Sequence, residues 1–159
     1  MVQARHSIRA RKGQQYLLAR ERWPKSCVAA MMIPMIRILL AEDDTSMREY
    51  LQRSLTRVGY DVDAVGCGTQ AIPLLQAARY DLLLTDIVMP EMDGIELAQK
   101  ASAIDANIKV MFITGFAAVA LQSGRTTPEA KLLSKPFHLK DLVAEVDRMF
   151  QSEDQHGRL

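Results

Sequence analysis

From residue 35 onward, short apolar runs alternate five times with longer segments in which apolar residues recur at helical spacing. The apolar runs lie at residues 36–41, 60–65, 81–86, 108–114 and 131–134, and the helical segments at 46–58, 69–78, 93–104, 116–122 and 138–151. Strict alternation of this kind predicts parallel strands joined by right-handed crossovers. We therefore expect an α/β, flavodoxin-like fold, in which five helices cover both faces of a five-stranded parallel sheet of order 2-1-3-4-5.

Residues with known capping preferences mark where several of these helices begin and end. Ser46 and Glu49 fit a capping box at the start of the first helix, and Gly59 is expected to end it. Asp93 is expected to cap the third helix. Pro73 falls in the second helical segment, where it is tolerable only near the first turn.

Charge is distributed unevenly along the 159-residue chain, although the net charge is only +1. Residues 1–34 contain seven Lys/Arg and one acid, for +6, whereas residues 35–159 contain thirteen Lys/Arg and eighteen acids, for −5. An acidic domain is a poor candidate for binding nucleic acid through its phosphates. No apolar run approaches the ~18 residues of a membrane span, and the two cysteines match no metal-binding spacing. We expect a cytoplasmic protein.

The basic segment at residues 1–34 shows no sustained apolar period. It could be a transit peptide, or a basic arm for nucleic acid, another acidic partner or a membrane surface. We expect instead a disordered leader, in part upstream of the true translation start, because Met31, Met32 and Met35 are alternative starts. One domain at 35–150 and a short tail at 151–159 then follow.

Polar residues of the domain gather where the expected strands end. Glu42 and Asp43 follow the first strand, Asp86 ends the third, Thr114 ends the fourth and Lys135 follows the fifth. Because the carboxyl ends of parallel strands meet at one edge of a sheet, we expect these three carboxylates, the hydroxyl and the ammonium to converge there.

Three close carboxylates repel one another and need a cation, and hard oxygen ligands favour Mg²⁺. Once the metal neutralises Glu42 and Asp43, Asp86 stays ionised and able to attack phosphorus, which gives an aspartyl phosphate. The metal and Lys135 can then cover the oxygens of the moving group, and Thr114 can donate a hydrogen bond to one. Taken alone, an acidic triplet is more often a solvated turn. The joint placement at four strand ends favours phosphoryl transfer.

Four segments, at residues 38–44, 81–94, 112–115 and 134–137, together resemble the receiver domain of two-component response regulators, a CheY-like domain. The resemblance covers residues 35 to about 150. It implies a signalling protein that catalyses its own phosphorylation from a phosphodonor and otherwise is not an enzyme. Its phosphodonor partner would be a histidine kinase or a histidine phosphotransfer protein.

The resemblance also implies roles for individual residues. Asp86 would be the phosphoacceptor, and Glu42, Asp43, Asp86 and the backbone carbonyl of Val88 would hold Mg²⁺. Thr114 and Lys135 would be the switch pair that binds the phosphate. A cis peptide bond is expected before Pro136. Asp44 lies one step beyond the acidic pair, near the site but not as a direct ligand.

Two features depart from the usual receiver pattern. Leu132 occupies the position, three residues before the lysine, where receivers usually carry Tyr or Phe. Residues 116–121 are apolar all round, where a surface helix should have a polar face. This helix is either short and mostly buried or a partner-docking face that contains Phe116, Val119 and Leu121.

Residues 112–121 and 132–139 are similar to a stand-alone receiver of alphaproteobacterial cell-cycle control. This implies an adaptor of the ClpXP protease and its substrates, which is active when unphosphorylated, is switched off by a phosphorelay and is recruited to a cell pole. The alternative is a phosphotransfer intermediate between histidine proteins, without an output of its own. Only nine residues follow Phe150, too few for a DNA-binding module.

Overall fold

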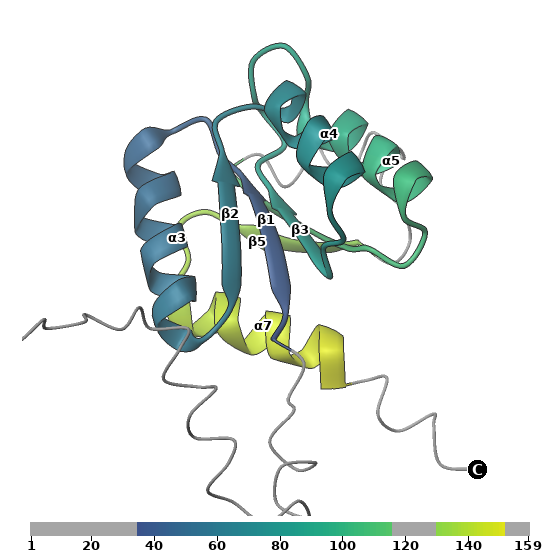
Figure 1. Cartoon of the computed structure of the whole chain (residues 1–159). Coiled ribbons are helices and arrows are strands. Elements are labelled where there is room, and N and C mark those ends of the chain that lie inside the picture. The colour runs from purple at the N-terminus through teal and green to yellow at the C-terminus, as the bar shows by residue number, and fades with distance from the viewer. Residues whose placement is uncertain (1–34, 116–129, 152–159) are drawn as a thin grey trace, which may run out of the picture. The chain divides into compact units, whose positions relative to one another are not determined.

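The computed structural model describes residues 35–115 and 130–151, which form a five-stranded parallel sheet with helices on both faces (Figure 1). The strands are β1 (Arg37–Ala41), β2 (Asp61–Val65), β3 (Leu82–Thr85), β4 (Lys109–Thr114) and β5 (Lys131–Ser134). Their order in the sheet, β2-β1-β3-β4-β5, confirms the predicted order.

The helices of the described residues are α3 (Thr45–Val58), α4 (Gly68–Ala77), α5 (Gly94–Ile104) and α7 (Leu139–Gln151). The expected helix at 116–122 lies outside the described residues. Among the residues that the structure describes, no helix is long and apolar enough to cross a membrane.

Two apolar cores lie on opposite faces of the sheet, because successive strand side chains point to opposite sides. Leu39 and Leu83 pack with α4 and α5 on one face, whereas Leu40 and Leu84 pack with α3 and α7 on the other. All four leucines are fully buried. This double burial explains why the strands read as continuous apolar runs.

The strand register aligns the carboxyl ends of the strands. Ala41, the last residue of β1, pairs with Val65 in β2 and with Thr85 in β3. Thr114, the last residue of β4, pairs with Ser134 in β5. Residues that directly follow β1, β3 and β5 are therefore brought to one edge of the sheet.

Two of the predicted helix boundaries are confirmed. Gly59 ends α3 in the left-handed conformation, at φ 119°, and its N–H donates to the carbonyls of Leu55 and Thr56. Asp93 caps α5, where its Oδ1 accepts from the backbone N–H of Glu96 at 2.7 Å.

The predicted capping box at Ser46 is wrong. Asp44 is the N-cap of α3, and its Oδ1 accepts from the backbone N–H of Met47 at 2.7 Å. Asp44 has an extended backbone and α3 already begins at Thr45, so that Ser46 lies inside the first turn.

Pro73 does not lie in the first turn of its helix, where a proline would be tolerated. It lies beyond the first turn of α4, where its missing N–H leaves the carbonyl of Thr69 without its helical partner.

Candidate phosphoacceptor site

Backbone hydrogen bonds extend the sheet by one residue beyond three of its strands and so position the candidate side chains. The N–H of Glu42 donates to the carbonyl of Val65 at 3.1 Å, and that of Asp86 donates to the carbonyl of Ala41 at 3.0 Å. The N–H of Lys135 donates to the carbonyl of Thr114 at 2.9 Å. The structure therefore brings these residues to one edge of the sheet, as their placement in the sequence suggested.

Three carboxylates meet at this edge. Ligand oxygens of Glu42, Asp43 and Asp86 all lie within 4.8 Å of one another. Glu42 and Asp86 are buried, at 1% and 8% exposure, whereas Asp43 is exposed to solvent. A cluster of hard oxygen donors that is open on one side fits a divalent cation such as Mg²⁺, which keeps several waters when it binds to protein.

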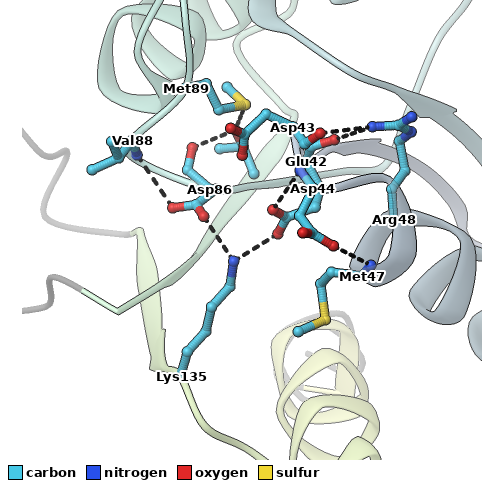
Figure 2. Close-up of polar contacts among 10 residues, drawn as sticks. Glu42, Asp43, Asp44, Met47, Arg48, Asp86, Val88, Met89 and Lys135 are labelled. Atoms are coloured by element: carbon cyan, nitrogen blue, oxygen red, sulfur yellow. Dashed lines mark hydrogen bonds and ion pairs between the residues drawn. The ribbon is translucent and has the colours of Figure 1, made fainter.

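Lys135 bridges two of the three carboxylates (Figure 2). Its Nζ lies 2.8 Å from Glu42 Oε2 and 2.7 Å from Asp86 Oδ2. Burial raises the pKa of Glu42, and the hydrogen bond from Lys135 opposes that shift in part. Burial opposes the charged form of Lys135, but the hydrogen bonds to Asp86 and Glu42 outweigh it and raise the pKa of its ammonium group.

The other predicted site residues lie around this cluster. The backbone N–H of Val88 donates to Asp86 Oδ1 at 3.2 Å, while the residue as a whole is 54% exposed. Thr114 is fully buried at the end of β4. The Lys135–Pro136 bond is cis, as expected. The metal-binding role of the Val88 carbonyl and the switch role of Thr114 remain predictions.

Asp44 is set apart from the neighbouring acids by its hydrogen bonds. Its side chain caps α3, and its backbone N–H donates to Glu42 Oε1 at 3.3 Å. It is not part of the carboxylate cluster formed by Glu42, Asp43 and Asp86. The expectation that Asp44 lies near the site without being a direct ligand is consistent with this geometry.

Two residues that the sequence analysis did not single out contact the backbone of the site. Arg48 donates from Nη1 to the carbonyl of Glu42 at 2.7 Å. A Cβ on Gly94 would lie 1.9 Å from the carbonyl oxygen of Asp86. Gly94 was visible only as part of the family-like segment 81–94, and no helical or strand periodicity pointed to Arg48.

Of the two departures from the receiver pattern, Leu132 lies within the described residues and the apolar segment 116–121 does not. Leu132 is half-buried and packs against the core beneath α4 and α5. The predicted docking residues Phe116, Val119 and Leu121 lie outside the described residues.

Comparison with known proteins identifies the class of protein to which this fold, with its carboxylate cluster at the sheet edge, belongs. Residues 38–147 match the response regulator receiver domain, so the chain belongs to the response regulator receiver family. It is therefore a signalling protein of a two-component system.

The chain is similar to a particular stand-alone receiver. It is 58% identical over 116 residues to the response regulator receiver protein CpdR of Brucella abortus, which covers 72% of this chain and 97% of that relative. The predicted resemblance to a stand-alone receiver of this kind is confirmed.

Two solved structures support the same assignment. A receiver protein from Sinorhizobium medicae has a TM-score of 0.68 at 33% identity and covers 74% of this chain and 95% of its own. The response regulator TrrA of Thermotoga maritima, solved in complex with Mg(2+)-BeF, has a TM-score of 0.64 at 27% identity and covers 73% of this chain and 100% of its own.

Proposed function

We propose that the chain is a single-domain response regulator that is phosphorylated on Asp86 and acts as a switchable adaptor of the ClpXP protease. The observation that carries the phosphorylation step is the cluster at the sheet edge, where Lys135 Nζ contacts Asp86 at 2.7 Å beside the acidic pair. The adaptor role is supported by the 58% identity to CpdR over nearly all of that protein.

In the proposed reaction, a carboxylate oxygen of Asp86 attacks the phosphorus of a phosphohistidine or of a small phosphodonor such as acetyl phosphate. The new P–O bond forms as the bond to the donor breaks, and the leaving imidazole or acetate departs with the electron pair. Lys135, already 2.7 Å from Asp86, binds an oxygen of the transferred group, and the Thr114 hydroxyl donates to another.

Glu42, Asp43, Asp86 and the Val88 carbonyl would hold Mg²⁺. The ion supplies positive charge opposite the oxygens of the transferring phosphoryl group. The acidic cluster, with all three oxygens inside 4.8 Å, supports this donor set. The complex of the response regulator TrrA with Mg(2+)-BeF supports Mg²⁺ as the cation.

The proposed output is made through protein contacts. Phosphorylation draws Thr114 toward the phosphate and shifts the adjoining segment, in which Phe116, Val119 and Leu121 form the proposed docking face. With Leu132 in place of the usual aromatic residue, this path does not depend on rotation of an aromatic ring. The protein would work in the cytoplasm and at a cell pole, with a histidine kinase or histidine phosphotransfer protein as its phosphodonor.

Acetyl phosphate labelling tests the phosphorylation step. We expect Mg²⁺-dependent labelling, which borohydride trapping and mass spectrometry would assign to Asp86. Asp86→Asn should abolish the label, and Asp93→Asn, a change of the same kind in a helix cap, should keep it. Undiminished labelling of Asp86→Asn, or full labelling without a divalent ion, would disprove the assignment.

Reconstituted proteolysis separates the adaptor from a phosphotransfer intermediate. An adaptor should stimulate ClpXP degradation of its substrates. Addition of acetyl phosphate should abolish the stimulation by wild type but not by Asp86→Ala, which has no phosphoacceptor. Val119→Glu and Leu121→Glu should lower the affinity for the partner by about 2 kcal/mol each while labelling stays normal. Ile104→Glu, on an exposed position of α5, is the matched control. A protein that exchanges phosphoryl groups but never stimulates degradation would instead be a relay.

A further inference from the structure

The segment between β1 and α3 carries two of the three carboxylates of the site, and one side chain, that of Arg48, donates to two of its backbone carbonyls. Arg48, in the first half of α3, donates from Nη1 to the carbonyl of Glu42 at 2.7 Å and to the carbonyl of Asp43 at 3.3 Å. Its Nη2 donates to Thr45 Oγ1 at 3.2 Å. Figure 2 shows the guanidinium on the side of this segment away from Asp86 and Lys135.

The space around the guanidinium is restricted. Arg48 is half-buried, and a Cβ on Gly66, just after β2, would lie 3.2 Å from its Nη1. The guanidinium thus lies between the segment after β1 and the segment after β2. A planar group with several fixed N–H directions can hold more than one oxygen in this setting, which a lysine ammonium on a flexible stem cannot do in the same way.

The two carbonyls that Arg48 contacts belong to the same residues whose carboxylates enter the cluster. Fixing these carbonyls fixes the two peptide planes that follow Glu42 and Asp43. The directions in which the two side chains leave the backbone are then fixed as well. Without this contact, the exposed Asp43 would be the less constrained of the two, because Glu42 is also held by Lys135.

We propose that Arg48 is a positioning residue for the metal site: it does not touch the metal, but it holds the acidic pair in the geometry that binds a divalent cation. The inference rests on the proposed Mg²⁺ site. Two effects of Arg48 oppose each other, because its positive charge repels a nearby cation whereas its hydrogen bonds preorganise the ligands. The proposal states that preorganisation is the larger effect.

Mg²⁺ titration of the full-length protein without a phosphodonor tests this proposal. Binding would be followed by calorimetry and by the amide NMR shifts of residues 42–44 and 86–88. We expect Arg48→Met and Arg48→Lys to raise the Mg²⁺ dissociation constant by about tenfold, as loss of a hydrogen-bond partner behind a metal ligand typically does. The Lys variant keeps the charge, so its weakening isolates the hydrogen bonds.

Arg53→Met is the matched control. Arg53 lies on the same helix and its side chain is 74% exposed. Within the part of the chain that the structure describes, it pairs only with Glu49, so this change removes one positive charge away from the site. Its Mg²⁺ affinity should stay within about twofold of wild type, since exposed charges are strongly screened. Melting temperatures measured without Mg²⁺ show whether each variant is folded, and Arg48→Lys carries the test if Arg48→Met does not fold.

Unchanged Mg²⁺ affinity in Arg48→Lys, or tighter binding in Arg48→Met, would overturn the proposal and leave the metal site standing. Asp43→Asn distinguishes this result from failure of the site itself. If wild type binds no Mg²⁺, or if Asp43→Asn binds as well as wild type, the metal site is wrong and the role of Arg48 falls with it.

Discussion

Three consecutive acidic residues at the end of β1 have three different surroundings. Glu42 is almost fully buried and bonded to Lys135, Asp43 is exposed with its carboxylate in the cluster, and Asp44 caps α3. The three carboxylates therefore contact different groups, although the residues are consecutive in the sequence. The difference can be tested residue by residue.

The Mg²⁺ affinity should depend on Asp43 and much less on Asp44. Asp43→Asn should raise the Mg²⁺ dissociation constant by more than about tenfold, because it removes a direct charged ligand. Asp44→Asn keeps a side chain that can cap α3 and should change the constant by less than about threefold. Calorimetric titration of both variants measures this. Equal losses would mean that the acidic pair is displaced by one residue.

The structure leaves no room for a side chain at Gly94. A Cβ at this position would lie 1.9 Å from the carbonyl oxygen of Asp86 and 2.8 Å from its carbonyl carbon. Gly94→Ala should therefore lower the free energy of unfolding by about 3 kcal/mol, as overpacked positions do, and should slow acetyl phosphate labelling by displacing Asp86. Gly115→Ala, where a Cβ would meet no atom of the described residues within 4 Å, is the control for urea unfolding. A fully stable Gly94→Ala protein would show that this contact relaxes.

At the scale of the single element, α3 shows how a local pattern can suggest the wrong first residue. Ser46 and Glu49 satisfy the spacing of a capping box, but the side chain that accepts a helix N–H belongs to Asp44. Sequence spacing alone cannot distinguish two such candidates. The N–H of Glu42 still bonds to Val65 in β2, and α3 begins three residues later, at Thr45, with Asp44 as its cap. The end of β1 therefore decides where α3 begins.

The two candidate caps predict different stabilities. Asp44→Ala should lower the free energy of unfolding by about 1 kcal/mol, because the N–H of Met47 loses its acceptor. Ser46→Ala should change it by less than about 0.5 kcal/mol, as surface substitutions usually do. Urea unfolding followed by circular dichroism compares them. A larger loss in Ser46→Ala would restore the capping box.

At the scale of the whole molecule, two tyrosine–carboxylate hydrogen bonds join segments that are distant in sequence. Tyr60, just before β2, donates to Asp147 Oδ1 of α7 at 2.7 Å, and Tyr80, just before β3, donates to Asp63 Oδ2 of β2 at 2.7 Å. Burial raises the pKa of both phenols, and the hydrogen bonds to the carboxylates raise them further, to about 12 for Tyr80. The folded state therefore favours the protonated phenols.

This shift predicts how stability depends on pH. The folded-state pKa of Tyr80 lies above its ordinary value of 10, so its contribution is fully present below pH 10 and is lost as the pH rises through about 12. Tyr80→Phe should cost about 1.5 kcal/mol of unfolding free energy at pH 8, the strength of a hydrogen bond to a charged group, and much less near pH 12. Urea unfolding at pH 8, 9.5 and 11 measures the difference from wild type. A difference that stays constant with pH would contradict the assignment.

Much of this fold follows from patterns that are local in the sequence. Apolar runs such as 81–86 imply strands buried on both faces, and their alternation with helical segments implies the parallel sheet and its order. Gly59 and Asp93 end and begin helices where their conformational and hydrogen-bonding preferences predict. These properties depend on neighbours a few residues apart, so they can be read without knowing the rest of the fold.

The contacts that give the site its chemistry depend on closure of the whole sheet. Lys135 and Glu42 are 93 residues apart, and only the pairing of β1, β3, β4 and β5 brings them to 2.8 Å. Arg48 and Gly94 contact the backbone of residues only five to eight positions earlier in the chain, but no helical or strand periodicity relates those positions. Residue types at strand ends could suggest which groups meet. The distances and the burial were decided only by the tertiary structure, because segments as far apart in sequence as β1 and β5 must be brought to one sheet edge before Lys135 can meet Glu42.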